Sequence, residues 1–95
     1  MSKSSALQIL RSIKPALQSR YPLTRLALFG STARNEADQG SDVDVLVEVD
    51  PSIGLRFVDL ASEIEAALGQ PADVVSRRAI DPARWAMIQP ELADA

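Results

Sequence analysis

The chain has 95 residues, of which 46% are hydrophobic, and a formal net charge of −3. This length predicts a single domain over residues 1–95, and the apolar content is typical of a globular protein rather than a disordered one. Cysteine and histidine are absent, which excludes disulfides, thiolate catalysis, Cys/His zinc sites and a histidine general base. Any catalysis must therefore use carboxylates, hydroxyls, Lys, Arg or a metal on oxygen ligands.

The acidic balance argues against direct nucleic-acid binding, because such surfaces need clustered Lys and Arg. No apolar run approaches the roughly 18–20 residues that a membrane span needs. Arg11 and Lys14 interrupt the apolar positions that a signal peptide would need near the N-terminus. We therefore expect a cytoplasmic protein that does not insert into a membrane.

The first predicted element is a helix over residues 4–19, where apolar side chains recur at helical spacing. Pro15 lies inside this pattern and is expected to kink or split the helix. Residues 26–29, LALF, predict a short strand that is apolar on both faces and therefore central in a sheet. A polar connection with at least one helical turn follows over residues 30–41.

The second half of the pattern is clearer. Residues 42–49 alternate between polar and apolar and predict a strand, and residues 57–68 carry one apolar stripe and predict a helix that ends at Gly69. Residues 72–76 predict a third strand. The order helix–strand–turn–strand–helix–strand indicates a small α/β (α+β) domain with a mixed sheet, covered by helices mainly on one face.

The domain core is expected over about residues 5–80, followed by a tail over residues 81–95. A short helix is predicted near residues 82–88. The tail's large apolar side chains either cover the sheet edge or form an exposed patch that contacts a partner. They are Trp85, Met87, Ile88 and Leu92.

Gly30 and Ser31 stand where a buried strand ends and a helical turn begins. Free backbone N–H groups at such a turn favour phosphate, glycine lets a ligand approach closely, and the serine hydroxyl adds a donor. The alternative is a tight turn in which Ser31 only caps the helix.

Asp42 and Asp44 are two residues apart at the start of the predicted second strand, so their side chains point to the same face. Their carboxylates would lie about 6–7 Å apart, and one divalent cation can bind between them. The alternative is a solvated strand end. Asp73 on the third strand would join the same cation if its strand pairs beside the second; otherwise it is a turn or cap residue.

Together these residues form the pattern Gly-Ser-x10-Asp-x-Asp. It resembles the signature of the DNA polymerase β-like nucleotidyltransferase superfamily. Residues 26–48, LALFGSTARNEADQGSDVDVLVE, are similar to the minimal nucleotidyltransferase (MNT) branch, whose members pair with HEPN-domain toxins in bacteria and archaea. The similarity extends over about residues 5–80.

The resemblance implies a role for each matching residue. The residues implied to bind the nucleotide are Gly30, Ser31, Arg34 and Ser41; those implied to bind Mg²⁺ and act in catalysis are Asp42, Asp44 and Asp73. Asn35 departs from the pattern, because the family usually has glycine there. We expect Asn35 to adopt the positive φ that glycine would otherwise provide.

The function implied by the resemblance is Mg²⁺-dependent transfer of AMP from ATP to a tyrosine of a HEPN-type toxin, with the chain acting as its antitoxin in a hetero-oligomer. Two alternatives stay open. In the first, the protein neutralises its partner by stoichiometric binding without catalysis. In the second, it is a small module that binds nucleotide as a sensor.

Overall fold

A computed structural model describes residues 1–95 and contains four α-helices, four strands and three short 3₁₀ helices. The helices are α1 (Lys3–Arg20), α2 (Gly30–Ala33), α3 (Arg56–Leu68) and α4 (Pro82–Ile88). The strands are β1 (Leu23–Phe29), β2 (Val43–Val49), β3 (Ala72–Ser76) and β4 (Ala93–Asp94). The 3₁₀ helices are η1 (Pro51–Ile53), η2 (Arg77–Ala79) and η3 (Gln89–Glu91).

The strands form one mixed sheet in the order β3-β2-β1-β4. Strand β2 pairs antiparallel with β1 and parallel with β3, and β4 pairs antiparallel with β1 at the edge. The predicted α/β class, the central place of the first strand and the pairing of the first two strands are confirmed. The two-residue strand β4 was not predicted.

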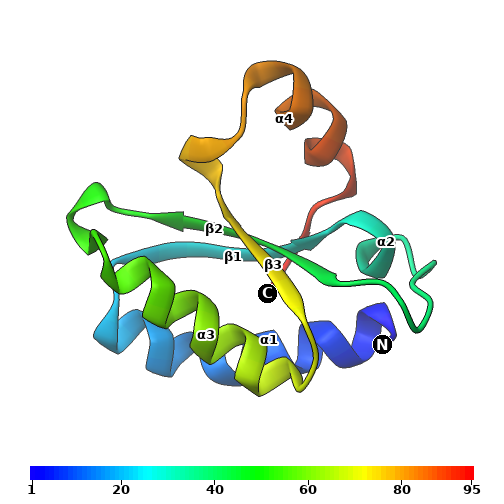
Figure 1. Ribbon diagram of the computed structural model, residues 1–95, viewed down its shortest axis with the longest axis horizontal. Helices are drawn as coiled ribbons and strands as arrows, with labels where there is room; N and C mark the ends of the chain where they lie inside the picture. Colours follow the sequence, from blue (N-terminus) through cyan, green and yellow to red (C-terminus); the bar gives the residue numbers. More distant parts are fainter.

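Helices α1 and α3 lie side by side on one face of the sheet (Figure 1). This α1/α3 face holds the larger apolar cluster, with 15 buried residues. Val43, Val45 and Val47 of β2 belong to it, together with Leu60 and Ile64 of α3. Side chains alternate between the two faces of the sheet along β2, so every second one packs against the helices, as the predicted period of two requires.

The opposite face carries α4 and a smaller cluster of five buried residues (Figure 1). Ile88 of α4 packs there against Phe29 and Leu46, and Trp85 covers them from a half-buried position. Met87 instead is 78% exposed. This α4 face was expected to be open, but the tail's apolar side chains cover part of it.

Three local predictions have clear outcomes. Gly69 ends α3 in the left-handed conformation (φ 72°), as predicted. Asn35 is the one non-glycine residue with positive φ (58°), which confirms the expectation for that position. Of the two outcomes expected at Pro15, a kink or a split, the split does not occur: α1 runs through Pro15 without a break, because packing of α1 on the sheet outweighs one missing backbone hydrogen bond.

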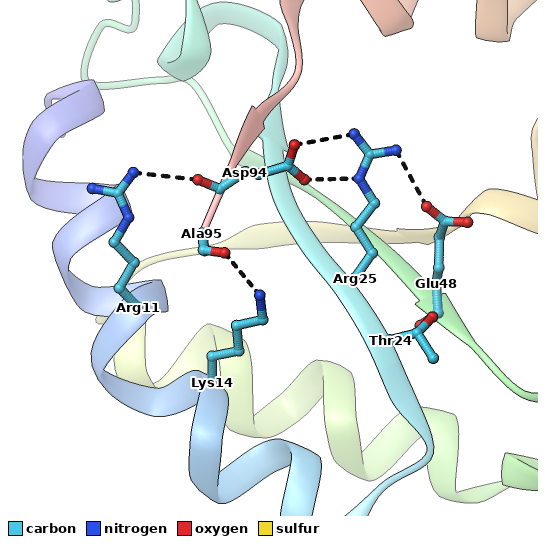
Figure 2. Close-up of polar contacts among 7 residues, drawn as sticks. All are labelled: Arg11, Lys14, Thr24, Arg25, Glu48, Asp94 and Ala95. Carbon is cyan, nitrogen blue, oxygen red and sulfur yellow. Dashed lines mark hydrogen bonds and ion pairs between the residues drawn. The ribbon is translucent and has the colours of Figure 1, made fainter.

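The end of the chain is fixed beside β1 by several polar contacts (Figure 2). The Ala95 N–H donates to the Leu26 carbonyl over 2.8 Å, and Arg25 pairs with the Asp94 carboxylate over 2.7 Å. Arg11 and Lys14 of α1 donate to the Asp94 and Ala95 carbonyls. None of the helices has both the length and the apolar character required to cross a membrane.

Candidate active site

The turn from β1 into α2 brings Gly30 against the side chain of Asp44. Gly30 has φ +71°, and a Cβ placed on it would lie 2.1 Å from the Asp44 Oδ2 atom. Any side chain at position 30 would therefore collide with that carboxylate. Glycine is required both by its backbone conformation and by the close approach of Asp44.

Asp44 and Asp73 are register partners on the parallel strands β2 and β3. Residues directly opposite each other on paired strands point to the same face, so both carboxylates belong to the α4 face. Asp44 is half-buried and Asp73 is exposed. The condition set for Asp73, a strand beside the second one, is therefore met.

The pKa of Asp44 is raised above its ordinary value, first because burial removes water from the carboxylate and next because of the negative charge on Asp73. Asp42 and Glu91 raise it further, and Arg84 opposes them. A raised pKa means that the negative charge at Asp44 is incompletely compensated. This is the electrostatic condition that a bound cation relieves.

Asp42 lies one residue before β2 and is exposed. With Ser41 it lines a cavity of about 320 Å³ at the loop before the strand. The Ser41 hydroxyl donates to Asp38 Oδ1 over 3.1 Å, so it stabilises that loop. No three acidic side chains lie close enough together to hold a metal ion in this arrangement. Of the predicted set of three, Asp44 and Asp73 are aligned by strand pairing, whereas Asp42 lies outside the strand.

Arg34 follows α2 and is held by two carboxylates. Its Nη1 donates to Glu91 over 2.8 Å, and its Nε donates to Glu36 over 3.2 Å. The other oxygen of Glu91 accepts the Gly30 N–H over 2.9 Å. Two of the predicted nucleotide-binding residues, Gly30 and Arg34, are therefore joined through one carboxylate. Ser31 is half-buried in the same turn.

Two residues near Asp44 were not singled out from the sequence. Glu91 lies in η3, and Arg84 lies in α4; both act on the Asp44 carboxylate through their charges. The sequence carries no signal for either, because each reaches the site only when the tail folds back across the α4 face. The largest cavity, about 380 Å³, is elsewhere: it surrounds Val49 and Arg78 at the other end of β2.

The chemistry of the donors fits a hard divalent cation. All the acidic groups near the turn supply carboxylate oxygens, which are the ligands that Mg²⁺ prefers. The uncompensated charge of Asp44 beside Asp73 would be neutralised by such an ion. Beside this pair, the Gly30 N–H and the Arg34 guanidinium already bind an anionic group. An acidic pair and two donors that bind an anion therefore lie next to each other at this turn.

Several known proteins are similar to this chain in sequence or in overall fold. The family described as nucleotidyltransferase domain matches residues 10–92. The chain is 38% identical over 74 residues to the protein adenylyltransferase MntA of Thermococcus cleftensis, covering 76% of this chain and 74% of that protein. It is 36% identical over 81 residues to a protein of Methanocaldococcus jannaschii provisionally named a protein adenylyltransferase, covering 81% and 80%.

A solved structure, provisionally described as a minimal nucleotidyltransferase, superposes with a TM-score of 0.81 at 31% sequence identity. The match covers 98% of this chain and 95% of that one. The family match spans most of the chain and includes the whole Gly-Ser-x10-Asp-x-Asp pattern. From its sequence and its fold alike, this chain belongs to the nucleotidyltransferase family and is an enzyme of that family.

Proposed function

We propose that this enzyme transfers AMP from ATP to a tyrosine hydroxyl of a HEPN-type toxin, depends on Mg²⁺, and acts as the toxin's antitoxin in the cytoplasm. The observation that carries the chemical part is the Asp44–Asp73 pair, aligned across β2 and β3 beside the Gly30 turn. Relatives named protein adenylyltransferases support a protein acceptor. The toxin partner rests on the family resemblance alone.

The donors at the turn would bind the triphosphate. The Gly30 N–H and the Arg34 guanidinium are directed at one anionic group, and the Ser31 hydroxyl lies in the same turn. Because Gly30 lacks a side chain, the phosphates can approach as closely as the Asp44 carboxylate does now. The α-phosphate would then lie beside the acidic pair.

Asp44 and Asp73, with Asp42 as the third carboxylate, would hold Mg²⁺. When bound, Mg²⁺ neutralises phosphate charge and lowers the pKa of an attacking hydroxyl. Asp73 is exposed, so it can reach an incoming acceptor and take the hydroxyl proton. The acceptor oxygen then bonds to the α-phosphorus, and pyrophosphate leaves. Such a reaction depends mainly on positioning and charge, which fits a site without histidine.

The test is to incubate the enzyme with ATP labelled at the α-phosphate, Mg²⁺ and a purified HEPN toxin, and to measure label on the toxin. Asp44→Asn and Asp73→Asn should each lower the labelling rate by about 10²–10³-fold, since each removes charge from the reacting centre. Glu48→Gln is the matched control: it lies on β2 too but pairs with Arg25, away from the turn.

Labelling of the toxin by the two aspartate variants at the wild-type rate would refute the catalytic proposal. Growth of toxin-producing cells distinguishes an enzymatic antitoxin from one that neutralises its partner by binding alone. An enzymatic antitoxin fails to rescue growth when Asp44 or Asp73 is changed, whereas an antitoxin that only binds its partner still rescues it. A binding module that only senses nucleotide would neither label the toxin nor rescue growth.

A further inference from the structure

The carboxylate of Glu91 occupies the donors that the proposed function assigns to the triphosphate. One oxygen accepts the Gly30 N–H over 2.9 Å, and the other accepts Arg34 Nη1 over 2.8 Å. A backbone N–H and a guanidinium are both donors that commonly bind phosphate oxygens in proteins. Glu91 therefore stands in the place of a phosphate group.

Glu91 differs in this respect from Glu36, the other acidic partner of Arg34. The Glu91 side chain is 23% exposed and bonds to two donors from different positions of the turn. The Glu36 side chain is 67% exposed, touches only the Nε of Arg34, and does so at 3.2 Å. Only Glu91 can exclude a ligand from both donors.

The fold keeps Glu91 close to these donors. It ends η3, and β4 begins two residues later. Backbone pairing of β4 with β1 and the Arg25–Asp94 ion pair fix that segment beside the turn (Figure 2). A carboxylate anchored in this way has a high effective concentration, so an incoming nucleotide competes with a group that never diffuses away.

Repulsion from nearby carboxylates weakens the hold of the Gly30 and Arg34 donors on Glu91. Its negative charge acts unfavourably on Asp44, which is also close to Asp73. With Asp42, the free enzyme thus gathers four carboxylates near one turn. Departure of Glu91 relieves part of this repulsion.

We infer that Glu91 is a built-in competitor of the nucleotide: it occupies the Gly30 and Arg34 donors in the free enzyme and must leave before the triphosphate binds. This inference rests on the proposed function. The measured affinity for ATP then equals the intrinsic affinity reduced by the fraction of molecules in which Glu91 has left. Removing the charge of Glu91 should therefore tighten nucleotide binding, although the residue lies in the nucleotide site.

The experiment is calorimetric titration of ATP with Mg²⁺ into the full chain and its variants. Glu91→Gln should bind ATP about tenfold more tightly than the wild type, because a neutral amide holds the guanidinium and the N–H less strongly. Glu36→Gln removes the same charge from the same arginine but leaves Gly30 untouched. It should stay within about twofold of the wild type, so it controls for general charge effects.

Equal or weaker binding by Glu91→Gln, with measurable binding by the wild type, overturns the inference and leaves the nucleotide site standing. Absence of ATP binding by all three proteins refutes the proposed function itself. If Glu91→Gln does not fold, the Gly30 amide resonance of the wild type is followed by NMR during the same titration. A shift that saturates with ATP supports displacement of Glu91, and an unmoved resonance at saturation overturns it.

Discussion

The two faces of the sheet are built from the same strands but serve different purposes. The α1/α3 face has 15 buried apolar residues, whereas the α4 face has five and carries the half-buried Asp44. Burial of apolar surface is the main stabilising term, so most of the folding free energy comes from the first face. The second face can therefore tolerate clustered carboxylates and a nearby polar turn.

The largest expected effect is the loss of stability when a buried isoleucine is truncated, and it is compared between the two faces. Ile64 of α3 and Ile88 of α4 are both buried, at 0% and 5% exposure. Ile64→Ala should lower the free energy of unfolding by about 4 kcal/mol, and Ile88→Ala by about 2 kcal/mol, because a smaller cluster collapses more easily around the cavity. Urea unfolding followed by circular dichroism measures both.

A protein of this size can lose its fold entirely when Ile64 is truncated. Ile64→Val and Ile88→Val then provide the same comparison, and each should lower the free energy of unfolding by about 1 kcal/mol or less. An equal or larger loss at Ile88 would contradict the assignment of stability to the α1/α3 face.

The second prediction concerns Asp44. Its folded-state pKa lies above the ordinary value of 3.8, so ionisation of Asp44 destabilises the fold as the pH rises from about 3.8 through that raised pKa. Asp44→Asn removes the penalty and should stabilise the protein near neutral pH by at most about 1 kcal/mol, given solvent screening of a half-exposed group. Thermal unfolding at several pH values measures this.

The advantage of Asp44→Asn should vanish below pH 3.8, where the carboxyl is protonated in both the folded and unfolded states. A variant that is less stable than the wild type at neutral pH would show that Asp44 is compensated in the free enzyme. Such a result would remove the electrostatic reason for a cation at this position.

The smallest effect is expected at Asp94, which lies on the same sheet but has a lowered pKa, chiefly because Arg25 donates hydrogen bonds to it. Its stabilising contribution is present above the ordinary pKa of 3.8 and is lost as the pH falls through the lowered folded value. Asp94→Asn should cost about 0.5 kcal/mol near neutral pH, because the pair is exposed.

Thermal unfolding of Asp94→Asn and of the wild type should converge at low pH and at high salt, where the ion pair is absent or screened. The pH dependence is thus opposite in sign to that of Asp44. A cost that persists unchanged at high salt would show that the hydrogen bonds from Arg25, rather than the attraction between the charges, account for the contribution of Asp94.

Local sequence signals predicted most of the fold. The stripe of α3, the third strand and the left-handed conformation of Gly69 each depend on a few neighbouring residues, so they could be predicted from the pattern. The positive φ of Asn35 was expected only from the family resemblance. Asp73 lies beside Asp44 only because β3 pairs with β2. From the sequence, that pairing could be stated only as a condition for Asp73 to join the site. The predicted set of acidic residues includes the pair that the sheet aligns, Asp44 and Asp73.

Glu91 and β4 could not be predicted, because both depend on contacts between residues far apart in the chain. Ala93 and Asp94 have little preference for a strand, and they adopt one only because β1 offers an unpaired edge. Glu91 reaches Gly30 across 61 positions of sequence. Neither charge nor periodicity in residues 81–95 indicates such a contact.

The parallel alignment of β2 with β3 also limits how the chain can misfold. A shift of β3 by one position would turn Asp73 toward α1 and α3, where a carboxylate would be surrounded by leucine and isoleucine without a partner. Misaligned molecules would therefore be less stable than correctly aligned ones. Proteases would remove them first, so the surviving molecules would be those with both aspartates correctly aligned.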